Sequence, residues 1–144
     1  MKNKVNPIGI FIVLIISVVI ALIFKKRIER LIKNLKDNRA KKKEQQLLEQ
    51  LGIPLSNSPS FFNALATELY QAVSWSWYNP DCDETGTQKA LMQLKTDRDY
   101  NELSLAFGVR DTYNMETYIQ SCLNGSEKNL VNQKWSSLGM TKRI

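Results

Sequence analysis

The pattern of hydrophobic and polar residues changes at residue 24. Before it, Val5 to Phe24 form an uncharged run of 20 residues, and Lys25, Lys26 and Arg27 follow directly. About 20 apolar residues in a helix cross a hydrocarbon core that is about 30 Å thick. No ionisable side chain interrupts the run, so it offers no path for protons or ions. The pattern predicts that residues 1–24 are a single transmembrane anchor.

Two other interpretations of this run are weaker. A cleaved signal peptide has a shorter apolar region and ends in small residues, whereas this run ends in Phe24, Lys25 and Lys26. A helix that is apolar on every face would be an unusual core element in a chain of this size. A retained anchor fits both the length and the charged end of the run.

A helical pattern without proline or glycine continues from Lys25 to Leu51. The spacing i, i+3, i+4, i+7 gives one narrow apolar stripe, made of Ile28, Leu31, Ile32 and Leu35. Residues 25–51 are predicted to form a basic helical stalk that ends before Gly52. The stripe could pair with a partner helix or a second copy of the chain, although its two interrupted repeats fall short of a sustained coiled coil.

A linker and then a folded domain are expected after the stalk. Residues 52–59 are rich in turn formers, and all three Trp and all five Tyr lie beyond residue 60. Caps and glycines divide residues 60–144 into about five short helices, and no segment alternates with period two. These helices are expected over about Pro59–Tyr78, Asp81–Leu94, Thr96–Gly108, Asn114–Gly125 and Ser126–Gly139. The predicted fold class is therefore all-α, with a span, a stalk and a small helical domain.

Positive charge is concentrated beside the predicted span. Residues 1–50 hold 12 Lys or Arg and 4 Asp or Glu, whereas residues 51–144 hold 8 and 10. Basic residues close to a membrane attract anionic head groups by roughly 1 kcal/mol each. We expect the residues nearest the span to bind anionic lipid: Lys25, Lys26, Arg27, Arg30 and Lys33. Nucleic acid is disfavoured as a partner, because no aromatic residue lies between Lys25 and Pro54 to stack on a base.

The same basic flank predicts the orientation of the span. Lys and Arg within about 15–20 residues of a span favour its cytoplasmic side, and more of them follow this span than precede it. This places the helical domain in the cytoplasm. In the alternative orientation the domain lies in a periplasm, outside the cell or on a virion membrane. There it would contact lipid or cell wall, for example in a lysis role.

The expected state of the two cysteines depends on that choice. Cys82 and Cys122 lie 40 residues apart, without the spacing of a metal or redox motif. In the cytoplasm they are expected to be reduced, with Cys122 on an apolar helix face beside Met115 and Ile119. Outside the cell they are expected to form a disulfide.

Short motifs within residues 83–138 resemble a single degenerate annexin repeat. The motifs are Asp83-Glu84 at the first helix, Glu102-Leu103 through Ala106-Phe107 at the end of the second, and Asn114-Met115-Glu116 through Leu123-Asn124-Gly125 at the third. The resemblance implies a compact helical module. It departs from the annexin pattern at the calcium loop, because Lys95-Thr96-Asp97-Arg98 occupies that place and contains no glycine. Calcium-dependent lipid binding is therefore not implied.

A weak candidate for a metal site lies near the start of the second domain helix. Asp81, Asp83 and Glu84 follow Asn79 closely, and calcium takes about six to eight oxygen ligands. Acidic residues that cap a helix are the commoner cause of such a cluster. We predict no metal and no cofactor.

Enzymatic chemistry finds little support in the composition. The chain has no histidine, which removes the usual general base near neutral pH, and it has no phosphate-binding loop. Glu68 could serve as a catalytic carboxylate of the glycosidase type. A position on a solvent-exposed helix face is the better interpretation of this residue. We therefore predict that the protein is not an enzyme.

The remaining functional signal is a group of aromatic residues at one helix end. Trp75, Trp77 and Tyr78 cannot all face one core from one helix, and Trp and Tyr are enriched in binding hot spots. Membrane contact is the other use of such rings, but a long stalk would hold them away from a bilayer. The sequence predicts a membrane-anchored structural or adaptor protein whose helical domain binds a protein partner through these residues.

Overall fold

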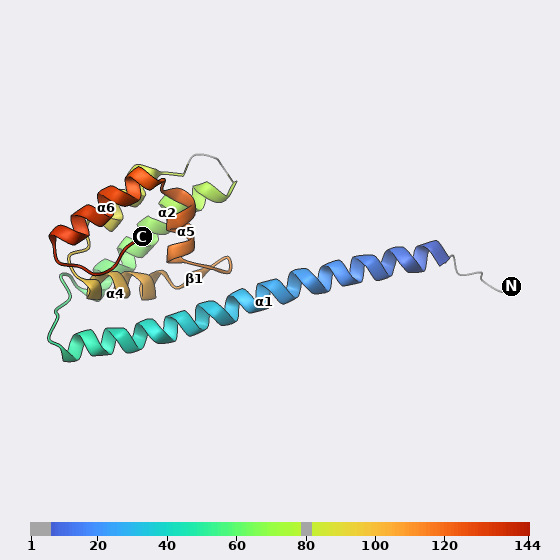
Figure 1. Cartoon of the computed structure of the whole chain (residues 1–144), viewed down its shortest axis with the longest axis horizontal. Coiled ribbons are helices and arrows are strands. Elements are labelled where there is room, and N and C mark those ends of the chain that lie inside the picture. The colour runs from blue at the N-terminus through green and yellow to red at the C-terminus, as the bar shows by residue number, and fades with distance from the viewer. Residues whose placement is uncertain (1–6, 79–81) are drawn as a thin grey trace.

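The computed structural model describes residues 7–78 and 82–144, and within these ranges the side chains of residues 7–19, 21 and 75–78 are not described. The elements are α1 (Pro7–Gln50), α2 (Pro59–Tyr78), α3 (Glu84–Leu91), α4 (Asp97–Phe107), β1 (Val109–Arg110), β2 (Tyr113–Asn114), α5 (Met115–Cys122) and α6 (Gly125–Ser137) (Figure 1). The predicted predominance of helices is confirmed. One small β-hairpin, formed by β1 and β2, was not expected.

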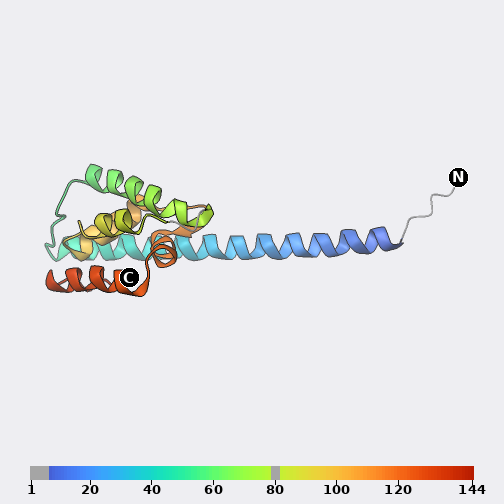
Figure 2. The ribbon, with the colours of Figure 1, turned by 90° about the horizontal axis from the view of Figure 1, so that it is seen from above.

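Helix α1 is continuous over 44 residues, which corresponds to about 66 Å. Figures 1 and 2 show the other helices gathered against its C-terminal half, while its N-terminal half extends away from them. Among the residues described, no helix is long and apolar enough to cross a membrane. Most of the predicted span, Val5–Phe24, lies outside the side chains that the structure describes.

The chain reverses at Gly52, which ends α1 as predicted. Its φ of 73° is in the left-handed region that favours glycine. The Gly52 amide donates to the Glu49 carbonyl and the Ile53 amide donates to the Leu48 carbonyl, both at 3.0 Å. This pair of bonds is a Schellman motif. Because of this reversal, α4 packs beside the second half of α1.

Side-chain caps determine where two of the domain helices begin. The Thr96 hydroxyl accepts from the Asp99 amide, and the Asp99 carboxylate accepts from the Thr96 amide, so α4 starts where the sequence predicts. Asn124 and Glu127 form the same reciprocal arrangement at α6. This cap makes Gly125 the first residue of α6, one residue before the predicted start.

Two other boundaries differ from those expected. Helix α3 begins at Glu84 with Asp83 as its cap, whereas the predicted start at Asp81 lies outside the described residues. Helix α5 ends at Cys122 rather than near Gly125, because the residues that follow form the cap of α6.

The hairpin turns through two residues with left-handed backbone. Asp111 has φ 48° and Thr112 has φ 75°, and the strands pair Val109 with Asn114 and Arg110 with Tyr113. A two-residue turn in which both residues have left-handed backbone matches the right-handed twist of the two strands that it joins. Threonine is β-branched and rarely adopts this conformation, so the turn carries backbone strain.

The hydrophobic core is built from α2 to α6 and the connections around them, and no described residue of α1 belongs to it. Trp135 of α6 is fully buried, and its indole N–H donates to the Leu91 carbonyl at 3.0 Å. The other large apolar side chains that are fully buried are Phe62, Leu65, Leu69, Val73, Leu91, Leu94, Leu103, Met115, Ile119 and Val131. The domain therefore has a complete apolar core of its own.

One buried carboxylate joins the connection after α1 to this core. Asp99 is fully buried, and its oxygens accept from the amides of Ser56, Lys95 and Thr96 at 2.8–3.1 Å. Three amide donors satisfy a carboxylate that would otherwise be costly to bury. The Ser56 bond holds the segment between α1 and α2 against the start of α4.

A disulfide links Cys82, just before α3, to Cys122 at the end of α5. Cys122 is buried beside Met115 and Ile119 in the core, as its helix face predicts. The two cysteines are thus paired, which is the state expected for a domain outside the cytoplasm.

Candidate functional site

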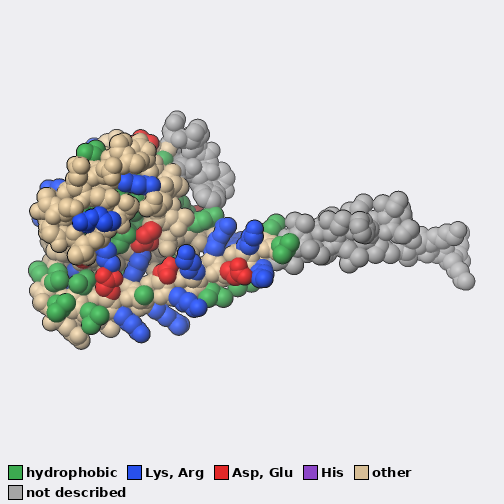
Figure 3. All heavy atoms as spheres, viewed as in Figure 1, with side chains coloured by type: hydrophobic (Ala, Val, Ile, Leu, Met, Phe, Trp, Pro, Cys, Tyr) green, Lys and Arg blue, Asp and Glu red, His purple; other side chains and the backbone are tan. Residues whose placement is uncertain are grey.

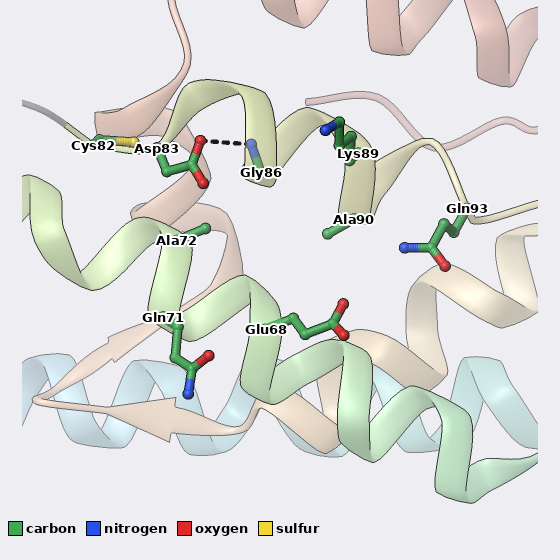
Figure 4. A pocket seen from close by; sticks show the side chains of 9 residues that line it. All are labelled: Glu68, Gln71, Ala72, Cys82, Asp83, Gly86, Lys89, Ala90 and Gln93. Carbon is green, nitrogen blue, oxygen red and sulfur yellow. Dashed lines mark hydrogen bonds between the residues drawn. The ribbon is translucent and has the colours of Figure 1, made fainter.

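A cleft of about 740 Å³ lies between α2 and α3. Its polar lining comes from both sides: Glu68 and Gln71 belong to α2, whereas Lys89 and Gln93 belong to α3 and the turn after it. Figure 4 shows these side chains on facing walls of the cleft, with Ala72 and Ala90 between them. The small alanine side chains leave the space that the longer residues surround.

Asp83 also lines this cleft, at the end nearest the disulfide. Its Oδ1 accepts from the Gly86 amide at 2.8 Å, which caps the first turn of α3 (Figure 4). A Cβ atom on residue 86 would overlap the Asp83 carboxylate, so a larger residue there would displace this capping side chain. Asp83 therefore has a local structural role, as helix capping predicts.

The cleft can bind polar groups, because its lining combines two carboxylates, one ammonium group and two side-chain amides. Glu68 and Lys89 are both exposed, in keeping with a solvated helix face for Glu68. Cys82 contributes a disulfide sulfur rather than a thiol. Among the described residues, no group of three or more His, Cys, Asp or Glu side chains could hold a metal ion. Of the weak metal candidates, Asp83 and Glu84 lie at the start of α3, and Asp81 is outside the described residues.

A second polar site lies where α1 meets the domain. Lys41 of α1 forms an ion pair with Glu116 of α5 and also donates to the Ser104 hydroxyl of α4. The Tyr100 hydroxyl donates to the same Glu116 carboxylate at 2.9 Å. Burial raises the pKa of Glu116, but the charge and hydrogen bond of Lys41 outweigh it and hold the pKa below its usual value. Burial and the neighbouring Glu116 carboxylate raise the pKa of Tyr100.

Polar contacts continue along the same side of α1. They are Arg30 to the Tyr113 hydroxyl, Asn34 to the Thr112 carbonyl, Gln45 to Glu102, Glu44 to Lys142 and Glu49 to Arg98, at 2.7–3.3 Å. Asn34 is the one α1 residue among those described that is fully enclosed, at 7% exposed. An apolar seam between α1 and the domain is absent from the described part of the interface. The long helix is held by hydrogen bonds and ion pairs.

The hairpin turn takes part in this contact. Asn34 donates to the carbonyl of the strained residue Thr112 at 2.8 Å. Next to it, Asp111 accepts from the Tyr70 hydroxyl at 2.9 Å, and the Arg110 guanidinium lies 4.4 Å from the centre of the Tyr70 ring. The hydrogen bond with Asp111 is the main cause of the raised pKa of Tyr70. These bonds hold the turn in its left-handed conformation.

The residues predicted to bind anionic lipid are not gathered in one patch. Lys25, Lys26, Arg27, Arg30 and Lys33 are all exposed, and their spacing distributes them around α1. Lys25 lies 3.9 Å from Glu29, one turn further on. Arg30 differs from the others because it hydrogen-bonds Tyr113 and its guanidinium lies 5.5 Å from the centre of that ring. The structure therefore assigns Arg30 to the contact with the domain.

The predicted partner-binding side chains of Trp75, Trp77 and Tyr78 lie outside the side chains that the structure describes. Their backbone forms the last turn of α2, at the end of the domain from which the N-terminal half of α1 extends (Figures 1 and 2). This end of the domain lies beside the stalk rather than beyond it. The long stalk thus does not separate the domain from the predicted span, contrary to our expectation.

Sequence reasoning missed the polar side of α1. Arg30, Asn34, Lys41 and Gln45 recur at helical spacing (i, i+4, i+11, i+15), which is the signal that could have revealed it. Lys41 is also the first residue of the basic run Lys41-Lys42-Lys43, a pattern that only weakly indicates nucleic-acid binding. In the structure its ammonium group is paired with Glu116.

Comparisons with protein families, with curated proteins and with solved structures each give no match. The resemblance of residues 83–138 to an annexin repeat therefore stays a prediction.

Proposed function

We propose that this chain is a non-enzymatic, single-pass membrane protein that presents its helical domain to a protein partner close to the membrane surface. The observation that carries the proposal is the continuity of α1. One helix includes most of the uncharged run of 20 residues and also the residues that hold the domain. A membrane anchor built this way fixes the position of the domain relative to the bilayer.

The contact nearest the predicted span supports a position close to the bilayer. Arg30 donates to the Tyr113 hydroxyl at 3.0 Å. Arg30 follows Phe24 by six residues, which is about 9 Å along a helix. The head-group region on each side of a bilayer is only about 5–8 Å thick. The hairpin would therefore lie just above the head groups.

The disulfide between Cys82 and Cys122 supports placement of the domain on the oxidising side of that membrane. Structural disulfides persist outside the cytoplasm and are rare within it. The basic flank of the span favours the opposite orientation. We give the disulfide more weight, because long segments cross membranes largely regardless of their charge and about 120 residues follow the span.

Labelling of the cysteines in intact cells tests this orientation. The chain has only two cysteines, so a membrane-impermeant maleimide should label nothing until an impermeant phosphine reductant is added. A Cys82→Ala/Cys122→Ala variant is the matched control and should stay unlabelled throughout. Labelling that needs cell lysis but no reductant would place the domain in the cytoplasm and contradict the proposed orientation.

The proposed partner surface combines the C-terminal turn of α2 with the cleft beside it. Residues 68, 71, 72 and 75 share one side of α2 by helical spacing, and the first three line the cleft. A photo-crosslinking amino acid at position 75 should capture a protein on the cell surface. The same group at Leu130, which is 52% exposed on α6, is the control. Equal capture at both positions would argue against a specific surface at the end of α2.

Contact between the domain and lipid is the second candidate function. The closeness of Arg30 and Tyr113 to the predicted span favours it, since Arg and Tyr are common at membrane interfaces. Brominated lipids should then quench the tryptophan fluorescence of the full chain in vesicles, and Trp75→Phe should reduce the quenching. Quenching that Trp75→Phe leaves unchanged would count against lipid contact at this end of α2.

A further inference from the structure

The described part of α1 carries an uncovered apolar stripe. The stripe consists of Ile28, Leu31, Ile32 and Leu35, which are 53%, 37%, 48% and 59% exposed. They recur at i, i+3, i+4 and i+7, so they lie on one side of the helix. Apolar residues scattered singly on a surface need no explanation, but an aligned set of four favours a contact.

The domain does not cover this stripe, because it occupies the opposite side of α1. Arg30, Asn34 and Lys41 mark the docked side through their bonds to Tyr113, Thr112 and Glu116. At about 100° per residue, the middle of the stripe points roughly 130° away from these three positions. The stripe therefore stays open while the domain is in place.

Nearly all the charged residues beside the stripe, or after it on the same side of α1, are basic. Lys25, Arg27 and Lys36 flank it, Arg39, Lys42 and Lys43 follow it, and Glu29 is the acidic exception. Figure 3 shows Lys and Arg side chains spread along this part of α1, with hydrophobic side chains between them. In helix pairs, the residues that border the apolar seam select partners of complementary charge.

We propose that this stripe binds an amphipathic helix of another protein, one whose apolar seam is bordered by Asp and Glu. The choice of a protein over lipid rests on the proposed membrane anchoring. In an upright α1, the stripe spans about 6–17 Å beyond Phe24, which is mostly past the head groups. Two copies of this chain anchored in one membrane would be parallel, and their basic borders would repel each other.

Binding of two synthetic peptides to the full chain in nanodiscs of zwitterionic lipid tests the proposal. Both peptides have a leucine seam, which is bordered by Glu in one and by Lys in the other. Fluorescence anisotropy should detect binding of the Glu peptide only. Leu35→Gln should weaken that binding by about tenfold or more, as loss of a central apolar anchor does.

Leu47→Gln is the matched control. Leu47 is 58% exposed, almost the same as Leu35, but it lies on another side of α1. This variant should bind the Glu peptide with unchanged affinity. The charge-reversal variant Lys36→Glu/Lys42→Glu should bind the Glu peptide more weakly and the Lys peptide more tightly than the wild-type chain does.

Several outcomes would overturn the inference. They are equal binding of both peptides, no effect of Leu35→Gln, or crosslinking of two chains through position 35. Protection of position 35 from labelling only in discs of anionic lipid would assign the stripe to the membrane instead. Co-elution of the chain with lipid discs tests the membrane anchor independently of peptide binding. A chain that binds the Glu peptide in detergent but never enters discs would contradict the membrane anchor and leave the stripe proposal standing.

Discussion

Lys41 of α1 forms an ion pair with Glu116 of α5, and this pair is the most enclosed charged contact between the long helix and the domain for which a bond is described. The Lys41 side chain is 15% exposed and that of Glu116 is 32% exposed. Tyr100 and Ser104 complete the group by hydrogen bonds to the same two residues. A docking contact made of such groups depends on charge, and it should respond to mutation and pH.

Replacement of Lys41 by methionine should destabilise the docked protein. Lys41→Met keeps the length of the side chain but leaves the Glu116 carboxylate without its cation. We expect the free energy of unfolding to fall by about 1–3 kcal/mol, because the half-buried carboxylate keeps its Tyr100 hydrogen bond but loses a charged partner. Urea unfolding of the full chain in micelles measures it. Lys42→Met removes an exposed neighbouring charge and should change stability by less than about 0.5 kcal/mol. Equal losses in both variants would show that the pair has no special role.

Acid should weaken the docked state. The pKa of Glu116 in the folded protein is lowered from its ordinary value of 4.5. Because this pKa is lowered, the ionised Glu116 stabilises the folded protein fully when the pH is above the pKa of the unfolded chain. The stabilisation is lost as the pH falls through the pKa of the folded protein. Thermal melts should therefore be level from pH 7 to about pH 5 and fall below about pH 4.5. Glu116→Gln should reduce this fall, and an unchanged pH profile in that variant would assign the acid sensitivity to other carboxylates.

Asp97 is the main competing carboxylate. It accepts from the Thr141 hydroxyl at 2.6 Å and from the Thr141 and Lys142 amides at 2.9–3.1 Å, and these bonds outweigh burial and lower its pKa below the ordinary value of 3.8. Because the ordinary pKa of Asp97 is 3.8 and that of Glu116 is 4.5, the loss of the Asp97 contribution should begin at a lower pH. The variant Asp97→Asn therefore separates the contributions of the two carboxylates. It should still lose stability just below about pH 4.5, where Glu116 begins to be protonated.

Reduction of the disulfide should lower stability measurably. Cys82 and Cys122 are separated by 40 residues, and closing a loop of this length in the unfolded chain corresponds to about 4 kcal/mol in the chain-entropy account. Differential scanning calorimetry with and without reductant measures the shift. In Cys82→Ala/Cys122→Ala, melting should occur near the temperature of the reduced protein and be insensitive to reductant. A reductant effect in this variant would point to a cause other than the disulfide.

The parts of this fold that the sequence predicts are those with local causes. Thr96 with Asp99, and Gly52 with Pro54 after it, act within a few residues of each other, so their pattern is readable in one dimension. The apolar faces of the domain helices likewise predict most of the core, from Phe62 to Trp135.

The docking of α1 has causes that are distant in sequence, and the sequence alone did not indicate it. Lys41 and Glu116 are 75 residues apart, and neither residue is unusual where it stands. The hairpin was missed because its left-handed turn uses Asp111 and Thr112 instead of the Asn-Gly or Asp-Gly that signals such turns. Contacts with Asn34 and Tyr70 hold that turn, and both come from other helices. The Cys82–Cys122 pairing was left open for a similar reason, since it depended on the compartment.

The helical domain should fold without α1. Its core is formed by α2 to α6 and adjoining segments, and none of the described α1 residues is part of it. A fragment of residues 52–144 keeps the disulfide, the buried Trp135 and the amide bonds of Asp99 to Ser56, Lys95 and Thr96. It loses only the polar contacts with α1. The half-buried Lys41–Glu116 pair is the costliest of these, and the exposed ion pairs contribute about 0–1 kcal/mol each.

We therefore expect this fragment to melt cooperatively and to give dispersed amide resonances in two-dimensional NMR spectra. The matched control is the same fragment with Trp135→Ala, which empties the centre of the core and should cost about 3–5 kcal/mol. That variant should lose the cooperative melt. A wild-type fragment that is already unfolded would mean that α1 supplies essential stability through its polar contacts. The stalk would then be part of the folded unit rather than a support to which the domain is docked.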